Sequence, residues 1–327
     1  MKTGVLDFPI KHIDGNLVFS KDGTVTAYYE VSGFNYDFLD HDDKLIPFQS
    51  QTAFLFNNKN DLHFMLEPFP SNIEEILGTT IEDIKMKNYL LKDNGIRLME
   101  ATKEALSKRK EIQETSEYLQ FIGVQLIPDL NKYKDANAGL GLISSIKEFF
   151  KGVNAQINRA NGLHSMDILE EEIKMWKDQS ETAMDSIRSA FNCNIKELNT
   201  AQAVYLLEKE FSVMQSNSDI KKRRNFTTGE KVEGLDDEGR SQRAIRPKET
   251  AFFDLQNTNI EEDTPTSLIF RKEVNDEVKE MHVKYLVAHS MDSENYFPNF
   301  EWLYNIQSRM NFPISVSVRH ITKRMSV

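Results

Sequence analysis

Cysteine is almost absent from this chain: its 327 residues include one, Cys193. A single thiol excludes an internal disulfide and any zinc site that needs several cysteines, and it fits a reducing compartment. No basic residue stands directly beside Cys193 to lower its pKa. We therefore interpret it as an inert thiol that is buried or half-buried.

Long apolar runs are missing as well. No stretch of about 18 consecutive apolar residues occurs, so the sequence predicts no membrane-spanning helix. Residues 1–15 show neither a long apolar run nor a small-residue cleavage site, so we expect no signal peptide.

Positive charge is in deficit, because 40 Lys and Arg residues face 51 Asp and Glu residues and leave a net charge of −11. This acidity argues against a protein that binds nucleic acid over its whole surface, although it is compatible with a local basic patch. Hydrophobic residues make up 39% of the chain, which is too apolar for a disordered protein. The length suggests about two domains that need no disulfides.

The signature motifs of several enzyme classes do not occur either. The phosphate loop G-x-x-x-x-G-K-[ST], the nucleophile elbow G-x-S-x-G and the zinc motif H-E-x-x-H are all missing from the sequence. The nearest echo of a phosphate loop, residues 228–231, lacks the leading glycine. The pair Gly139 and Gly141 lacks the third glycine of a dinucleotide-binding turn. We therefore expect no catalytic residue and no bound cofactor in this chain.

Histidines and acidic clusters do not form a recognisable metal site. Residues 40–43 (Asp-His-Asp-Asp) place an imidazole among carboxylates, but adjacent residues do not readily converge on one ion, so we interpret them as a helix cap. His282 and His289 are seven residues apart on a predicted strand and so face opposite sides. His63 is expected to pack within a strand. Solvated surface explains the acidic runs at 170–172 and 236–238.

Hydrophobic periodicity predicts an α+β fold, in which strand-rich N- and C-terminal parts flank a mainly helical middle. Residues 17–20 and 24–31 predict a β-hairpin around an Asp-Gly turn, because apolar and polar residues alternate over 24–31. A helix capped by Asp42 or Asp43 follows, with Pro47 in its first turn. The stripe it is expected to present consists of Leu45, Phe48, Thr52 and Leu55.

A strand over 62–66, ended by the proline-containing residues 67–70, completes a hairpin–helix–strand order. The C-terminal part repeats this order. Residues 267–274 and 277–289 predict a second hairpin, a helix begins near Phe297, and residues 314–318 alternate as a final strand.

Four segments are expected on this basis. Residues 1–92 form an N-terminal α+β unit, and residues 93–215 form a mainly helical region with one strand near 118–127. Residues 216–250, which hold few apolar residues, form a mobile polar loop. Residues 251–327 form a C-terminal α+β part that packs with the rest.

The sharpest local feature is the basic run Lys221, Lys222, Arg223 and Arg224 within the predicted loop. Four adjacent cations attract the phosphates of anionic lipid or of nucleic acid. Acidic residues follow the run and partly neutralise it, so we favour a solvated loop as its explanation.

Several segments at the two ends resemble one known family. They are Phe8-Pro9-Ile10-Lys11, Asp14-Gly15-Asn16-Leu17-Val18-Phe19, Val31 to Leu39, Tyr296-Phe297-Pro298, Trp302-Leu303-Tyr304 and Phe312-Pro313-Ile314-Ser315-Val316. In these segments the chain resembles the large VirB-four-type ATPase of type IV secretion, in the form found in Gram-positive conjugative elements. In that family a membrane-proximal N-terminal module precedes a RecA-like motor domain, which carries the Walker loops and forms hexamers.

The resemblance implies that this chain corresponds to the N-terminal module without the motor domain, to which ATP and Mg would belong. It therefore implies a non-catalytic docking and oligomerisation module for DNA transfer, which binds small membrane proteins of the conjugation channel, its own motor domain and further copies of itself. Its expected location is cytoplasmic and peripheral, at the inner face of the cell membrane. The expected partner contacts are Phe34, Tyr36 and Phe38, whereas Phe48 is expected in the core.

Three alternatives stay open. The first is a module that binds nucleic acid or anionic lipid through Lys221–Arg224, although the acidic balance counts against nucleic acid. The second is an enzyme whose site is assembled from scattered residues. The third is direct adhesion to a membrane.

Overall fold

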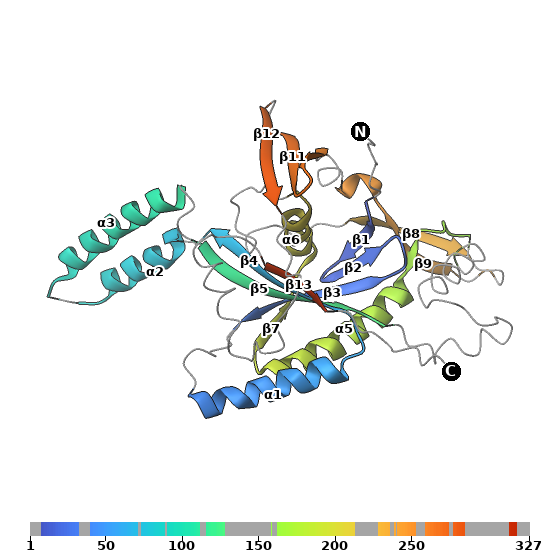
Figure 1. Cartoon of the computed structure of the whole chain (residues 1–327), viewed down its shortest axis with the longest axis horizontal. Helices are drawn as coiled ribbons and strands as arrows, with labels where there is room; N and C mark the ends of the chain where they lie inside the picture. Colours follow the sequence, from blue (N-terminus) through green and yellow to red (C-terminus); the bar gives the residue numbers. More distant parts are fainter. Residues whose placement is uncertain are drawn as a thin grey trace.

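The computed structural model describes residues 8–32, 40–70, 73–88, 90–111, 116–127, 158, 162–212, 228–235, 239, 241–252, 259–274, 277–284 and 314–318. These residues form three antiparallel sheets, of seven, three and three strands, together with five α-helices (Figure 1). The predicted α+β class is confirmed.

The seven-stranded sheet is the centre of the molecule. Its strands run in the order β1 (Ile10–Asp14), β2 (Leu17–Ser20), β3 (Val25–Ser32), β5 (Ser116–Gln125), β4 (Leu62–Pro70) and β13 (Ile314–Val318). A seventh strand, β7 (Asn194–Glu197), pairs with the second half of β3. The predicted hairpin of β2 and β3 is confirmed, and Gly23 adopts a positive φ of 86° in its turn.

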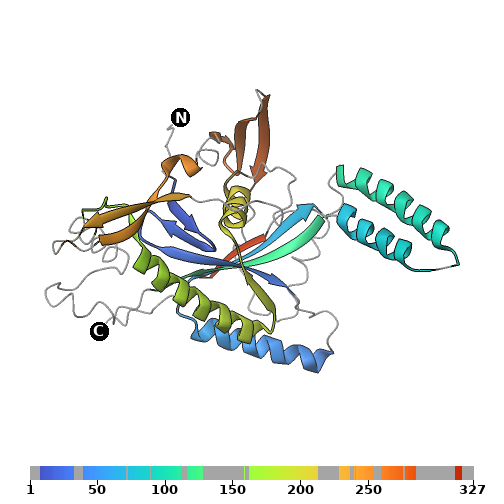
Figure 2. The same cartoon turned by 180° about the vertical axis from the view of Figure 1, so that it is seen from behind.

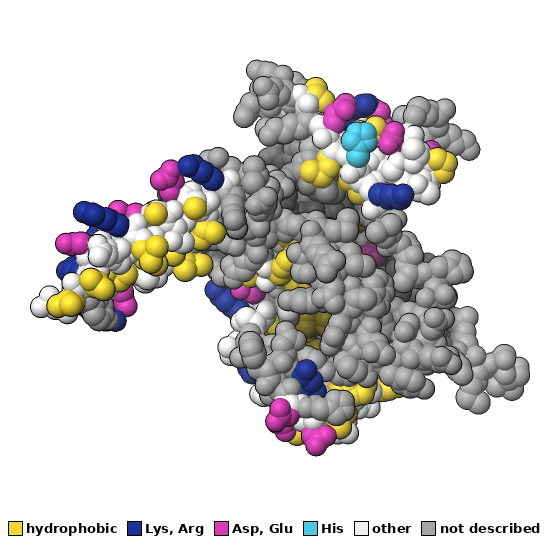
Figure 3. All heavy atoms as spheres, turned by 60° about the vertical axis from the view of Figure 1, so that its left-hand side comes forward, with side chains coloured by type: hydrophobic (Ala, Val, Ile, Leu, Met, Phe, Trp, Pro, Cys, Tyr) yellow, Lys and Arg dark blue, Asp and Glu magenta, His cyan; other side chains and the backbone are white. Residues whose placement is uncertain are grey.

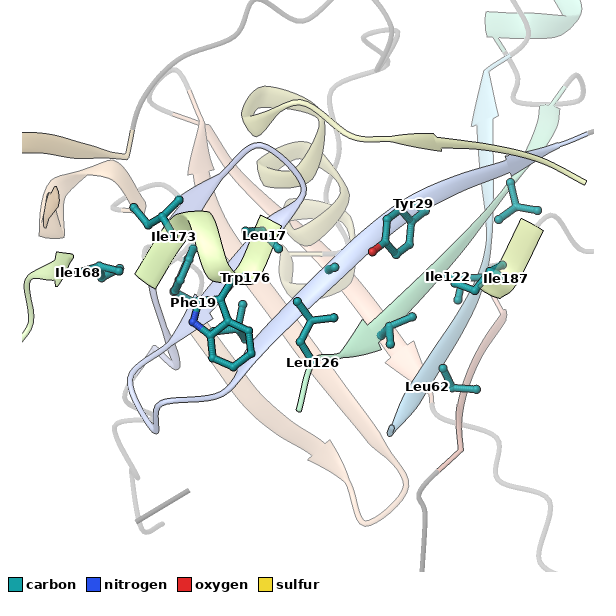
Figure 4. Packing of buried hydrophobic residues seen from close by; sticks show 14 of the residues in the cluster. Leu17, Phe19, Tyr29, Leu62, Ile122, Leu126, Ile168, Ile173, Trp176 and Ile187 are labelled. Carbon is teal, nitrogen blue, oxygen red and sulfur yellow. The ribbon is translucent and has the colours of Figure 1, made fainter. Parts of the chain in front are cut away.

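Helix α5 (Glu170–Phe191) covers one face of this sheet, and α1 (His41–Asn57) packs on α5 (Figure 2). The alternation along β3 points Val25, Ala27, Tyr29 and Val31 to the same buried core. Trp176 of α5 is 2% exposed and lies among these side chains (Figure 4). Asn192 ends α5 in a left-handed conformation.

A second core lies with α6 (Thr200–Ser212). Every residue from Ala201 to Leu207 is buried. Most of these residues share one buried cluster with Phe121 and Met65 of the sheet and with Phe252, which belongs to the 3-10 helix η3 (Glu249–Phe252). Helices thus lie on both faces of the sheet, and the strands carry buried side chains on both sides.

A small sheet replaces part of the loop that was predicted over 216–250. Its strands are β6 (Ile168–Leu169), β9 (Ser241–Pro247) and β8 (Gly229–Leu235). The prediction is wrong for residues 229–235 and 241–247, because charged side chains on their exposed face conceal a buried face of small residues such as Ala244. Glycine is required at 229, where a Cβ would lie 2.4 Å from Cγ2 of Ile245.

The third sheet consists of β10 (Asn259–Thr264), β11 (Ser267–Val274) and β12 (Glu277–Lys284), and it confirms the second predicted hairpin. The predicted final strand is confirmed as β13. It pairs with β4 in the central sheet, so the C-terminal part shares that sheet with the N-terminal unit. The helix predicted near Phe297 lies outside the described residues.

Helices α2 (Ile73–Met86) and α3 (Lys92–Glu111) form a hairpin that extends away from the sheet (Figure 1). They connect β4 to β5, which are neighbours in the central sheet. The strand predicted near 118–127 is thereby confirmed, whereas the predicted boundary at residue 92 falls inside this insertion and does not separate two units.

Two local predictions need correction. The strand β4 does not end at Leu66 but continues through Pro68 to Pro70, because its pairing with β5 runs on to Pro70, whereas the described pairs with β13 cover Leu62–Leu66. In α1 the N-cap is Asp40, whose side chain makes no capping bond, and Pro47 lies inside the helix, beyond the first turn.

Candidate functional site

Helix α1 presents large apolar side chains to solvent. They are Leu45, Ile46, Phe48, Leu55 and Phe56, of which Ile46 is 65% and Phe56 82% exposed. The expectation that Phe48 lies in the core is wrong, since its side chain is exposed. The physical reason is that α1 packs through another face: the Phe54 ring meets the Phe191 ring of α5 edge-on, with centroids 5.5 Å apart.

Apolar residues therefore occur on more than one face of α1, while α5 covers one. A helix that is apolar all round is typical of a buried position. On the outer side of α1, a contiguous apolar surface of this kind marks an interaction site. We call Leu45, Ile46, Phe48, Leu55 and Phe56 the α1 surface.

A groove of about 1070 Å³ lies between α1 and α5, beside the end of β5. Phe54 and Ala53 of α1 and Val124 of β5 supply apolar walls, as do Leu126 and Ile127 just after β5. Helix α1 and the residues after it also contribute polar groups, such as Ser50 and Lys59, and α5 contributes both polar side chains, such as Asp185, and apolar ones, such as Ile187. Apolar and hydrogen-bonding groups thus alternate along the groove, which suits a peptide segment, since such a segment needs both kinds of contact.

A second hollow, of about 760 Å³, lies where β1, α5 and the small sheet meet. Four lysines and three carboxylates line it, and some are paired: Lys177 Nζ lies 2.8 Å from Asp14 Oδ2, and Lys231 Nζ lies 3.8 Å from Glu170 Oε1. Among the residues that line this hollow, His12 has the most strongly shifted pKa, and its side chain is buried with 2% exposure.

Burial lowers the pKa of His12 to about 4, against the weaker opposing effect of Asp14. Its Nδ1 lies 2.8 Å from the Thr228 hydroxyl. A ring that is neutral near pH 7 and already bonded to a buried hydroxyl is suited to holding the structure together, whereas a general base works best with a pKa near the operating pH.

Residue Thr228 explains what this part of the molecule does. Its Oγ1 accepts a hydrogen bond from the Ile13 amide at 2.8 Å and donates one to the Ile13 carbonyl at 2.9 Å. Because a hydroxyl has one proton, the third bond must come from His12 Nδ1–H. The hydroxyl thus joins β1, at the edge of the central sheet, to the start of β8, and the hollow is a structural joint.

The other ionisable groups that sequence reasoning singled out are placed as follows. His63, on β4, lies edge-on to the Tyr28 ring, and its Nε2 is 2.6 Å from Ser315 Oγ. His282 Nδ1 lies 3.5 Å from Asp263. Cys193 is buried, and that burial raises the pKa of its thiol.

Residues 229–231 belong to strand β8, so they do not form the loop that a phosphate site would need. Asp42 and Asp43 are exposed in the first turn of α1. Throughout the described ranges, no three His, Cys, Asp or Glu side chains gather in a way that could hold a metal ion. Of the helices in those ranges, none is long and apolar enough to cross a membrane.

Several residues that sequence reasoning singled out lie outside the described residues. They are the predicted contact residues Phe34, Tyr36 and Phe38, the basic run Lys221, Lys222, Arg223 and Arg224, the pair Gly139 and Gly141, and His289.

The α1 surface was missed because the pattern was fitted to one stripe. The signal was nevertheless present, since Phe54 comes nine residues after Leu45 and so lies on the opposite side of the helix, which gives α1 a second apolar face.

Comparison with known proteins assigns no family: neither the family models nor the curated proteins contain a match to this chain.

Proposed function

We propose that this chain is a non-catalytic docking and oligomerisation module of a conjugative DNA-transfer ATPase, and that a partner protein covers the α1 surface. The observation that carries the proposal is that α1 is apolar on more than one face, whereas within the described residues it packs on α5 and leaves Ile46, Phe48 and Phe56 exposed. The partners in view are small membrane proteins of the transfer channel, the motor domain, and a second copy of the chain. The resemblance of both chain ends to the VirB-four-type ATPases supports this choice, and a peripheral position at the inner face of the membrane follows from it.

The size of the exposed groups supports a protein partner. Full burial of one large apolar side chain contributes about 1.5–3 kcal/mol, so Phe56 and Ile46 together would supply several kcal/mol. Aromatic anchors that sit beside a groove are typical centres of binding energy in protein interfaces. The groove between α1 and α5 adds hydrogen-bonding groups on both of its sides, which would fix the direction and register of a bound segment.

Site-specific photo-cross-linking in the cells that make the protein tests this proposal. A photoreactive residue at Phe56 should cross-link to a channel protein, to the motor domain or to a second copy. The matched control is Val278 on β12, which is 64% exposed and lies on a different sheet. Identical cross-links from both positions, or none from Phe56, would contradict the proposal.

A second experiment tests the non-catalytic part. The purified chain should show no ATP turnover above that of buffer, with Mg present. Metal-dependent hydrolysis that co-purifies with the chain through several steps would contradict the proposal.

A further inference from the structure

The far end of the α2–α3 hairpin combines exposed apolar side chains with lysines. We call residues Lys85–Lys92 the hairpin tip. Leu90 is fully exposed, Met86 is 84% exposed and Leu91 is 66% exposed. Figure 1 shows that the tip lies at the end of the hairpin away from the central sheet, and Figure 3 shows apolar side chains along the hairpin.

The hairpin is built to hold its tip out in solvent. Ile81 of α2 is buried, although the hairpin extends away from the sheet. Close to the tip, a Cβ on Gly95 would lie 3.8 Å from the side chain of Ile84, so the two helices approach closely there. The Nζ of Lys92 donates a hydrogen bond to the carbonyl of Lys85 and links the two ends of the tip.

The charge of the tip is opposite to that of the whole protein. It contains Lys85, Lys87 and Lys92 and no acidic residue, although Glu82 and Asp83 precede it and Asp93 follows it, in a chain whose net charge is −11. Asp83, just outside the tip, pairs with Lys87 at 3.3 Å, but both side chains are more than half exposed, so solvent weakens the pair. The tip is therefore a small apolar cluster that is flanked by cations.

We infer that the hairpin tip binds the surface of a bilayer that contains anionic lipids, with Met86, Leu90 and Leu91 entering the headgroup region. Apolar side chains bordered by lysines suit this boundary, because the apolar groups leave water while the ammonium groups meet lipid phosphates. A second copy of the tip is a poor occupant, because it would bring three further lysines against these three. This inference goes beyond the docking role of α1, which involves another surface.

The contact is expected to be reversible and sensitive to salt. Three apolar side chains and three lysines give weak adhesion, and screening by salt removes the part that the lysines contribute. One chain would therefore sample the membrane, and several copies in an assembly would hold it there more tightly.

Flotation of the whole chain with phosphatidylcholine vesicles, with and without phosphatidylglycerol, tests the inference. The wild-type chain should float with the anionic vesicles. The double variant Leu90→Ser/Leu91→Ser should bind them about tenfold more weakly, since about 1.4 kcal/mol corresponds to a factor of ten. The variant Lys85→Gln/Lys87→Gln should bind anionic vesicles much more weakly, and its residual binding should depend less on salt than that of the wild-type chain.

Two matched controls separate the tip from other surfaces. Ile46→Ser/Phe56→Ser on α1 should leave flotation unchanged, so a failure of the docking proposal can be told from a failure here. Neutralising Lys221–Arg224 with glutamine should also leave most of the binding. All tip positions changed are exposed, so each variant should keep the wild-type circular dichroism spectrum.

The inference is overturned if the wild-type chain stays unbound in the presence of anionic vesicles, which is also the result expected if the tip serves an acidic protein instead. It is equally overturned if binding survives both tip variants, or if it disappears with the Lys221–Arg224 variant alone.

Discussion

Replacing Thr228 by valine tests the joint between the central sheet and the small sheet. Valine has nearly the shape of threonine but no hydroxyl. The change would leave the amide and the carbonyl of Ile13 and the Nδ1–H of His12 without their partner, in a region where Thr228 is fully buried. Each unsatisfied buried group costs about 1–3 kcal/mol, but relaxation of the edge strand recovers part of this.

We therefore expect Thr228→Val to lower the free energy of unfolding by about 3–5 kcal/mol, which is a large share of the ~5–15 kcal/mol that stabilises most domains. The control Thr228→Ser keeps the hydroxyl and removes a methyl group, so it should cost about 1 kcal/mol.

Urea unfolding at pH 7, followed by fluorescence of the buried Trp176, measures both values. The midpoint should shift strongly for the valine variant at an unchanged slope. A valine variant within about 1 kcal/mol of the wild-type protein, or a serine variant as unstable as the valine variant, would refute the reasoning.

Three further predictions concern the same region. The pKa of His12 falls from 6.5 in the unfolded chain to about 4 in the folded one, so the unfolded chain binds more protons between these pH values. The contribution of His12 to stability is therefore complete above about pH 6.5, and it declines by up to ~3 kcal/mol as the pH falls to 4. The variant His12→Asn should lack this pH dependence when unfolding curves of the two proteins are compared. Arg246 binds the buried carboxylate of Asp167 with two hydrogen bonds, of 3.0 and 2.8 Å. Arg246→Met leaves the buried carboxylate of Asp167 without its cation, so it should destabilise the protein more than Asp167→Asn, which leaves the half-exposed guanidinium in water. Equal losses of stability in urea unfolding would count against this. Gly229→Ala should lower the melting temperature clearly, because its Cβ would overlap Ile245 and the cost of such overpacking is about 1–3 kcal/mol; a melting temperature equal to that of the wild-type protein would disprove the overlap.

Local patterns predicted those elements whose signals are local. The β2–β3 hairpin follows from strict alternation and an Asp-Gly turn, and β11–β12 follows from two runs that flank Asn275-Asp276. The pairing of β13 with β4 joins residues about 250 positions apart, and no local pattern encodes a partner at that distance. The strands β8 and β9 were missed because their outward residues are charged and their inward residues are small.

For the candidate surfaces, too, the sequence predicts what is local and leaves open what depends on the fold. An apolar periodicity shows that a helix has a face to bury, but whether that face meets the protein's own core depends on how many sides the fold covers. Phe48 illustrates this, since its place on a regular stripe predicted burial, but α1 packs on α5 with the face that holds Phe54 and leaves Phe48 exposed. Leu90 and Leu91 carry no periodic signal, and their exposure depends on where the α2–α3 hairpin points.

Hydrogen–deuterium exchange of α1 tests the central claim most directly. The measurement compares the purified chain with the assembly extracted from the cells that make it. If a partner protein covers the α1 surface, the amides of residues 45–57 should exchange at least about tenfold more slowly in the assembly, while those of α3 keep their rates. Equal exchange of α1 in the two samples would show that nothing docks there and would contradict the account.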